Sequence, residues 1–305
     1  MNSKIELLQG TSIGLITPSS PLFPGRLEAS IEFFEKHGCK VKVGNHNTKS
    51  DRFLAGTDEE RAEDIMNFFN DPEVDALVVT GGGAGSVRTL PLLDYKAIKN
   101  NPKPIIGFSD TTSLQLGIYS KTNLRSFTGF TCRDVAELQS LDPLIEDGLV
   151  NCFIQNNYSI SGGETVNTGK VTAPIIGGNL MCLLFLIGTP FQPNFKDKIF
   201  FFEEVWSEPY VMDGMLSQLY LAGIFDEVAG VIIGKFKNCE SKIHADRDGS
   251  SDAVINDWCK KIKAPCIKDF PYGHFDSRAV LPIGQLATLD ATNCRLDIIF
   301  GKEAS

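Results

Sequence analysis

The sequence lacks any hydrophobic run long enough to cross a membrane. Its longest apolar stretches, such as residues 183–187 and 199–202, stay far below the ~18 residues that a spanning helix needs. Runs of this length are typical of buried core elements. Residues 1–10 also lack the apolar segment and the small-residue cleavage site of a signal peptide. We therefore expect no membrane partner and a cytoplasmic location.

Positive charge is also scarce. Lys and Arg number 29 against 38 Asp and Glu, which leaves a formal net charge of −9 over 305 residues. Because phosphate backbones bind to basic surfaces, this balance argues against nucleic acid as a partner. Hydrophobic residues make up 42% of the chain, enough for a folded core, and the length favours two domains or one large one.

Disulfide and metal-binding patterns are absent too. The eight cysteines are scattered without a C-x-x-C pair, and no H-E-x-x-H motif or Cys/His cluster occurs. Scattered cysteines in a long chain without a secretion signal are typical of reduced core residues. We expect neither a disulfide framework nor a zinc site.

The first half of the chain alternates strand and helix patterns. Leu27, Ile31 and Phe34 have helical spacing, and Thr57 with Glu60 forms a capping box ahead of a second helix. Strands are expected at residues 13–17, 40–43, 75–80 and 104–108, and a further helix at 110–121. Strand–helix repeats at this spacing predict an α/β domain whose parallel sheet carries helices on both faces.

The pattern changes at the polar segment 156–172, which is rich in Gly, Ser, Thr and Asn and is typical of a linker or an edge hairpin. Beyond it, β patterns at 199–203, 228–233, 285–290 and 295–300 mix with helical patterns at 180–187, 210–222 and 251–262. The last two β segments predict an antiparallel hairpin. We predict an N-terminal domain over residues 1–160 and a β-rich α/β C-terminal domain over residues 161–305.

Ser109 stands between a buried strand and a helix, two residues after Gly107. A serine on such a turn projects its hydroxyl above the carboxyl edge of the sheet, where the N–H groups of the new helix can stabilise an oxyanion. Serine is also a good helix N-cap, and G-x-S-D is not the G-x-S-x-G signature. Nucleophile and helix cap are both open interpretations.

A glycine loop at residues 81–85 follows the strand 75–80. Glycines let a backbone approach a ligand closely and supply N–H donors. The loop matches neither the G-x-G-x-x-G nor the G-K-[ST] nucleotide fingerprint. It is either a plain tight turn or a donor loop for an anion or oxyanion beside Ser109.

Only four histidines occur. We expect His37, His46 and His244 at the surface, whereas His274 lies in a turn with small and aromatic neighbours. Glu203 and Glu204 end a buried strand, where alternation directs one toward the core side and the other away. A carboxylate in this place is either solvated or held to orient a base.

Ser109, Glu203 and His274 occur in the order Ser…Glu…His, which is the order found when a strand-end serine is the nucleophile. In that arrangement His274 takes the hydroxyl proton and Glu203 fixes the imidazole. Trp206 and Tyr210 follow Glu203 and are candidates to line a pocket, although Tyr210 also fits an ordinary helix face. The convergence of three residues so distant in sequence is a hypothesis.

Short motifs recur in a fixed order over nearly the whole chain. They are ITPSSP at 16–21, GG at 82–83, RTLPLLD at 88–94, GFSD at 107–110, IGGNL at 176–180, GTP at 188–190, IFFFE at 199–203, EPY at 208–210, GH at 273–274 and LPIG at 281–284. Each is weak alone. In this order the chain resembles the serine-type LD-carboxypeptidases, or muramoyltetrapeptide carboxypeptidases, together with the related microcin C self-immunity hydrolases.

The resemblance implies Ser109 as nucleophile, Glu203 as orienting carboxylate and His274 as base, with an oxyanion hole formed by the N–H groups of Gly83 and Asp110. It implies two domains with the site between them, a homodimer, and no metal or organic cofactor. The implied substrate is a small peptide. Members hydrolyse the amide between an L-centre and the terminal D-Ala of cytoplasmic murein tetrapeptides, a step of peptidoglycan recycling.

The chain departs from the family pattern close to the expected substrate. Many carboxypeptidase members have an Arg just before the two glycines, where this chain has Gly81, and Ala84 replaces an aromatic or polar residue after them. Trp206 also interrupts the usual acidic run. We expect Gly82, Trp206 and Tyr210 to contact substrate.

Two alternative functions stand beside the carboxypeptidase. Immunity-type members also lack the Arg, so the first alternative is a microcin C-type hydrolase of a peptidyl- or aminoacyl-nucleotide amide. The second is a non-catalytic small-ligand-binding module, in which Ser109 only caps a helix.

Overall fold

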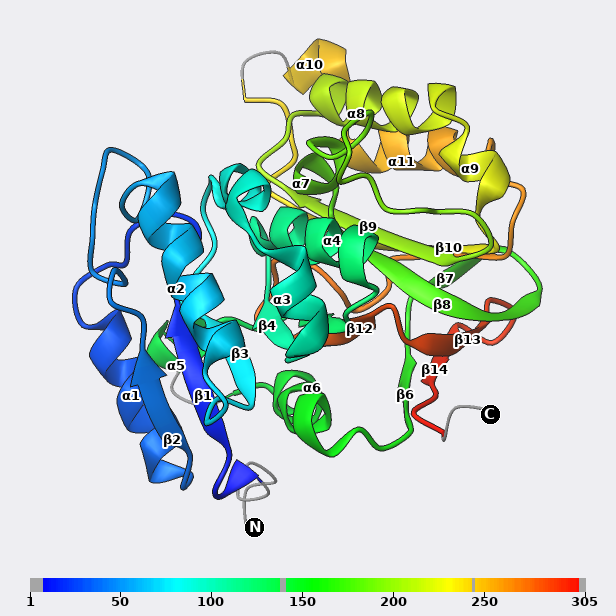
Figure 1. Ribbon diagram of the computed structural model, residues 1–305. Helices are drawn as coiled ribbons and strands as arrows, with labels where there is room; N and C mark the ends of the chain where they lie inside the picture. The colour runs from blue at the N-terminus through cyan, green and yellow to red at the C-terminus, as the bar shows by residue number, and fades with distance from the viewer. Residues whose placement is uncertain (1–7, 138–140, 243–244, 302–305) are drawn as a thin grey trace. The chain divides into compact units, whose positions relative to one another are not determined.

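The computed structural model describes residues 8–137, 141–242 and 245–301. The chain forms two compact units (Figure 1). The first contains the residues up to Gln155 together with Phe185–Pro193 and Ala279–Gly284, and the second contains Asn156–Leu184, Asn194–Arg278 and the residues from Gln285 onward. Among the described residues, no helix combines the length and the hydropathy needed to span a bilayer.

The first unit contains a six-stranded sheet in the order β12-β5-β4-β3-β1-β2. Its strands are β1 (Ser12–Ile16), β2 (Lys40–Val43), β3 (Ala76–Val79), β4 (Ile105–Gly107), β5 (Ser126–Thr128) and β12 (Leu281–Ile283). The first five are parallel, and β12 pairs antiparallel with β5. Strands β1, β3 and β4 are buried along their whole length, as their apolar sequences predict.

Helices cover both faces of this sheet. They are α1 (Arg26–Lys36), α2 (Asp58–Asn70), α3 (Tyr95–Asn100), α4 (Thr111–Thr122), α5 (Cys132–Glu137) and α6 (Pro143–Ile154), with a 3-10 helix at Ser86–Leu92. Helix α1 packs against α5, whereas α2, α3, α4 and the 3-10 helix pack with one another. Right-handed crossovers require this division, because the chain moves outward from β1 to β2 and then back across β1 to β3.

The sheet order therefore reverses between β1 and β3. At such a switch point the loops at the carboxyl ends of the two strands diverge to opposite faces, and ligands bind in the crevice between them. In this unit the two loops are residues 17–25 after β1 and the glycine loop, residues 81–85, after β3.

The second unit contains an eight-stranded sheet in the order β6-β14-β13-β8-β9-β10-β11-β7. Its strands are β6 (Tyr158–Ser161), β7 (Glu164–Asn167), β8 (Lys170–Asn179), β9 (Ile199–Val205), β10 (Gly230–Lys237), β11 (Cys266–Lys268), β13 (Leu286–Asp290) and β14 (Arg295–Ile298). Strands β8, β9, β10 and β11 are parallel to their neighbours in this group, and the outer pairings are antiparallel. The expected β13–β14 hairpin is confirmed.

The helices of this unit are α7 (Leu180–Leu184), α8 (Pro209–Leu221), α9 (Ile224–Glu227), α10 (Ala245–Asp248) and α11 (Ser251–Cys259). Helix α8 packs against α9 and α11 (Figure 1). The unit is β-rich, as the sequence predicts.

Neither form predicted for segment 156–172, a linker or an edge hairpin, is what the structure contains. Strands β6 and β7 lie at the two opposite edges of the eight-stranded sheet and pair with β14 and β11. Only Gly162 and Gly163, both with positive φ, separate them in sequence. A link this short requires the two edges to lie close together at that point, so the sheet is strongly curved.

Candidate active site

Ser109 occupies a sharp turn between β4 and α4. Its φ of +66° is left-handed, a conformation that costs a residue with a side chain about 1–2 kcal/mol and that is found at functional sites. The turn requires Gly107, because a Cβ there would lie 2.6 Å from Cγ2 of Thr111. Helix α4 begins after Asp110, and Ser109 does not have the extended backbone of an N-cap residue. The helix-cap interpretation therefore has no support in the backbone.

The glycine loop lies directly against this serine. A Cβ added to Gly82 would lie 2.9 Å from Cβ and 3.2 Å from Oγ of Ser109. Gly83 has a φ of +119°, and a Cβ there would lie 2.2 Å from Oγ of Ser20. The same Oγ accepts a hydrogen bond of 3.1 Å from the N–H of Ala84. Two strand ends that the sequence separates thus meet at Ser109, and the loop is more than a plain tight turn.

The carboxylate of Asp110 holds the glycine loop in this position. Asp110 is 1% exposed. It accepts hydrogen bonds from the N–H groups of Ser86 (2.8 Å) and Gly85 (3.2 Å) and from the hydroxyl of Ser19 (2.6 Å). One buried carboxylate therefore connects the loops that follow β1 and β3 to the residue beside Ser109.

A buried arginine on α2 holds the same two loops from another direction. Arg61 is 2% exposed, and its Nη1 donates to the carbonyl oxygens of Pro18 (2.5 Å) and Gly85 (2.8 Å). Nη2 of Arg61 forms an ion pair with Asp58. The same carboxylate also pairs with Nη2 of Arg88 at 2.7 Å. Arg61 was not predictable from the sequence, because an arginine within a charged helix carries no local signal of burial.

The second unit contains a buried carboxylate–imidazole pair. Glu203 is 0% exposed, and its Oε2 lies 2.7 Å from Nδ1 of His274. Asn179 donates from Nδ2 to the other carboxylate oxygen at 3.2 Å. The sequence left open whether the glutamate is solvated or held against a base. It is held.

Strand geometry explains how these residues meet. Strands β8 and β9 are parallel, and their register places Asn179 opposite Glu203 at the carboxyl edge of the sheet. His274 follows β11, the outer parallel strand, in a turn that needs Gly273. That glycine has a φ of +140°, and a Cβ on it would lie 2.6 Å from the carbonyl oxygen of Lys235. The carboxyl edge of parallel strands again supplies the functional groups.

Glu204 does not reach solvent on the opposite face of β9. It is 2% exposed and accepts hydrogen bonds from the N–H groups of Met181 (2.9 Å) and Val205 (2.8 Å). Burial raises the pKa of Glu204, and these two hydrogen bonds oppose the rise. Both faces of this strand are covered, so both glutamates are buried.

The aromatic candidates differ in exposure. Trp206 and Tyr210 are each 65% exposed. Trp258 is 4% exposed, donates from Nε1 to Asp213 at 2.9 Å and packs against Phe225. Of these three side chains, Trp206 and Tyr210 are the two that offer a surface to a ligand.

The other histidines and the cysteines do not form a recognisable catalytic or metal site among the described residues. His37 and His46 are half-buried, and His244 lies outside the described residues. All eight cysteines are unpaired in the structure, and seven of them are buried. Among the described residues, no group of three or more His, Cys, Asp and Glu side chains is arranged to hold a metal ion.

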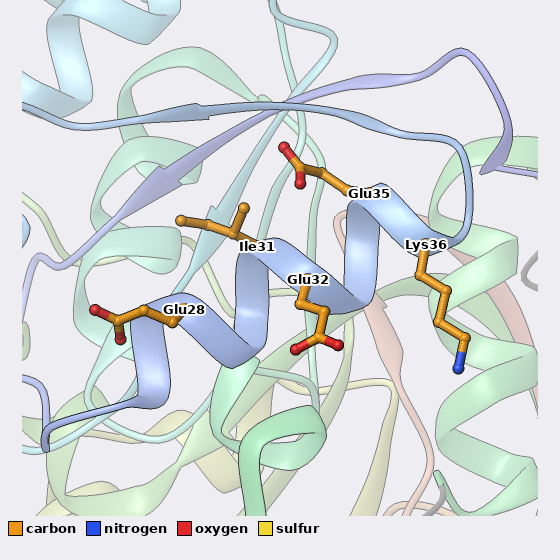
Figure 2. A pocket seen from close by; sticks show the side chains of 5 residues that line it. All are labelled: Glu28, Ile31, Glu32, Glu35 and Lys36. Atoms are coloured by element: carbon orange, nitrogen blue, oxygen red, sulfur yellow. The ribbon is translucent and has the colours of Figure 1, made fainter.

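A surface depression of about 470 Å³ on α1 is lined by Ile31, Lys36 and three glutamates, Glu28, Glu32 and Glu35. Figure 2 shows that the glutamate carboxylates project in different directions and do not converge. The side chains that line this depression therefore do not form a cluster that could act together on one substrate.

Both halves of the chain match one protein family. The LD-carboxypeptidase N-terminal domain matches residues 13–129, and the LD-carboxypeptidase C-terminal domain matches residues 172–289. The chain belongs to the LD-carboxypeptidase family, a family of serine-type carboxypeptidases. The resemblance based on the sequence motifs is confirmed.

Individual relatives carry two kinds of name. The chain is 31% identical to a Bacillus subtilis protein named probable murein peptide carboxypeptidase, over 95% of this chain and 92% of that protein. It is 27% identical to the microcin C7 self-immunity protein MccF of Escherichia coli, over 96% and 94% of the two chains. The solved structure of MccF in complex with aspartyl sulfamoyl adenosine matches with a TM-score of 0.88 at 26% identity, over 97% and 98% of the two chains. The two-domain α/β fold predicted from the sequence is confirmed.

Proposed function

We propose that this protein is an LD-carboxypeptidase that hydrolyses the amide between an L-centre and the terminal D-Ala of murein tetrapeptides through an acyl-enzyme. The observation that carries the proposal is the 2.7 Å contact between the fully buried Glu203 and His274. A buried carboxylate against one ring nitrogen fixes the tautomer of an imidazole and stabilises its protonated form.

In the first step Ser109 attacks. Because Nδ1 of His274 faces Glu203, Nε2 is the nitrogen that accepts the proton from Oγ of Ser109. Oγ bonds to the carbonyl carbon of the scissile amide, and the carbonyl electrons move onto oxygen. The mechanism requires Oγ and Nε2 to come within hydrogen-bond reach of each other.

The N–H groups of Gly83 and Asp110 stabilise the resulting oxyanion. Among the hydrogen bonds of the described residues, none uses either N–H as a donor. The N–H of Asp110 lies at the N-terminus of α4, where the first backbone donors have no helical partner and favour negative charge. The clamp formed by Arg61 and the carboxylate of Asp110 holds the glycine loop at a fixed position for this task.

Collapse of the intermediate transfers the proton from Nε2 of His274 to the amine nitrogen of D-Ala, and the C–N bond breaks. A water molecule then gives a proton to Nε2 of His274 and attacks the ester on Ser109. The tripeptide acid leaves, and the serine regains its proton. No step needs a metal or organic cofactor.

A second candidate function is hydrolysis of an aminoacyl-nucleotide amide. Three observations favour it: the relative MccF, the exposed Trp206 as a stacking surface for a nucleobase, and Gly81 in place of the family Arg. The chemistry at Ser109 is the same in both cases. The two candidates differ only in the substrate that the enzyme binds.

The test is to incubate the protein with murein tetrapeptide and, in parallel, with aspartyl sulfamoyl adenosine. The carboxypeptidase releases D-Ala from the tetrapeptide. Cleavage of only the nucleotide conjugate would replace the first proposal by the second.

Replacement of Ser109 by Ala separates an enzyme from a binding module. In an enzyme the variant should fall to the roughly 10³–10⁴-fold residual acceleration over water that binding and oxyanion donors supply. An unchanged affinity for the peptide together with no turnover in the wild-type protein would favour a binding module.

We also propose that the protein is a cytoplasmic homodimer that acts in peptidoglycan recycling. Family membership supports these assignments, and the eight unpaired cysteines are consistent with a reducing compartment. Analytical ultracentrifugation of the purified protein tests the dimer, and a monomer at micromolar concentration would refute it.

A further inference from the structure

Two lysines of β10 lie beside the catalytic histidine proposed above. Lys235 is exposed and Lys237 is half-buried. Their Nζ atoms lie 5.8 and 5.5 Å from the centre of one ring, that of Phe275, which directly follows His274. Both side chains therefore extend toward the turn that carries the imidazole.

A β-bulge directs Lys235 to this face. Ile233 pairs with Phe202 and Phe236 pairs with Glu204, so that Gly234 and Lys235 both lie opposite Glu203. The extra residue of a bulge re-aims a side chain, and bulges are frequent next to active sites. A Cβ added to Gly234 would lie 3.1 Å from Cβ of Glu203, so the bulge itself packs against the orienting carboxylate.

Lys237 shares the direction of Lys235, because alternate residues of a strand point to the same face. The backbone also connects the lysines to their surroundings. The N–H of Lys235 donates to the carbonyl of Tyr272 at 2.8 Å, and the carbonyl of Lys237 accepts from the N–H of Trp206 at 3.0 Å. The backbone of β10 is thus hydrogen-bonded to the segment before His274 and to the segment after Glu203.

The described part of the chain offers no carboxylate partner to either ammonium group. Within the described residues no acidic side chain lies within 4.0 Å of either Nζ, although the chain carries a net charge of −9. The charge of Lys235 acts on Asp269, but that carboxylate pairs with Lys268 at 4.0 Å. Two cations that share one aromatic ring repel each other, and a bound anion would relieve the repulsion.

We infer that Lys235 and Lys237 bind the carboxylate of the leaving D-Ala and so determine the specificity for a free C-terminus. The inference rests on the proposed function. In that mechanism His274 protonates the amine nitrogen of D-Ala, and the carboxylate carbon of an amino acid is two bonds from that nitrogen. A carboxylate receptor must therefore lie beside the imidazole, and these lysines extend toward Phe275 in the turn that carries it.

The experiment compares two substrates that differ in one group: the murein tetrapeptide and the same peptide ending in D-alaninamide. Wild-type protein should prefer the free acid. Lys235→Gln, Lys237→Gln and the double variant should lose roughly 10- to 100-fold in kcat/KM on the acid, mainly through KM, and little on the amide. Lys196→Gln is the matched control, because it removes one exposed charge from the same unit, and it should behave as wild type on both substrates.

Equal losses on acid and amide, or no loss on either, would refute the role of the lysines while leaving the carboxypeptidase proposal intact. Wild-type protein that cleaves neither peptide would refute the proposed function and the D-Ala carboxylate assignment with it. A loss seen only with aspartyl sulfamoyl adenosine would assign the lysines to the sulfamoyl linker of a nucleotide and overturn the carboxylate assignment.

Discussion

Replacing Gly82 by Ala tests whether the glycine loop must touch the nucleophile. The added methyl group would lie 2.9 Å from Cβ and 3.2 Å from Oγ of Ser109, closer than side-chain carbons pack. Either the loop or the serine must therefore move by several tenths of an ångström. Asp110 and Arg61 hold the loop, so we expect the serine side chain to shift as well.

The expected effect is larger on catalysis than on stability. Displacement of an oxyanion donor or a nucleophile by a fraction of an ångström to 1 Å costs on the order of 10²-fold in kcat. Overpacking of this kind costs about 1–3 kcal/mol of unfolding free energy, and a loop of intermediate exposure should lie at the lower end. Gly82→Ala should therefore remain folded and lose about 10²-fold in D-Ala release.

Gly81→Ala provides a matched control in the same loop. A Cβ at Gly81 would meet only Cδ2 of Leu22, at 4.0 Å, and we expect its effect on stability to stay within about 0.5 kcal/mol. Both variants are assayed for initial rates of D-Ala release and for thermal unfolding. Equal activities of the two variants, or a Gly82→Ala variant within twofold of wild type, would refute the close contact between loop and nucleophile.

Three further predictions concern stability and reactivity. Arg61→Met leaves two loop carbonyls without their buried donor and should cost about 3 kcal/mol in urea unfolding, whereas a loss below about 1 kcal/mol would contradict the clamp. Burial raises the pKa of Glu204 above its usual 4.5. The protonated carboxyl therefore stabilises the fold below that pH, and this stabilisation is lost as pH rises through the folded-state pKa. The stability of Glu204→Gln relative to wild type should therefore improve between about pH 4 and pH 8 in urea melts, and parallel pH profiles would count against it. Burial raises the pKa of the Cys132 thiol to about 12, and Cys294 is the one cysteine of eight that is not buried, so a thiol-reactive disulfide reagent should titrate one thiol quickly in the native protein. Rapid reaction of several thiols would contradict the described burial.

Local patterns in the sequence predicted the elements whose formation depends on neighbouring residues. The helical spacing of Leu27, Ile31 and Phe34 corresponds to α1, and the capping box of Thr57 and Glu60 is present with both hydrogen bonds. Buried strands were predictable where short apolar runs end in glycine or serine, as before Ser109. Helix periodicity, helix caps and the turn residues that end strands each depend on only a few neighbouring residues. These signals can therefore be identified from the sequence alone.

Pairing between distant segments was not predictable in the same way. Strand β12 completes the first sheet by pairing antiparallel with β5, although most of the second unit lies between them in sequence. Strands β6 and β7 separate to opposite edges despite a link of two glycines. The edge to which a strand pairs depends on which sheet edges the rest of the chain leaves free. The local hydrophobic pattern of the strand does not specify that edge.

The same distinction between local and long-range information applies to the candidate site. The residue types and their order along the chain were sufficient to nominate Ser109, Glu203 and His274 and to point to the family. Only the folded units revealed that Gly82 lies against the serine, that Arg61 clamps its loop, and that Lys235, at a bulge, extends toward the ring of Phe275. Those contacts join residues from different elements, and they exist only because strand register and helix packing bring the side chains within a few ångströms.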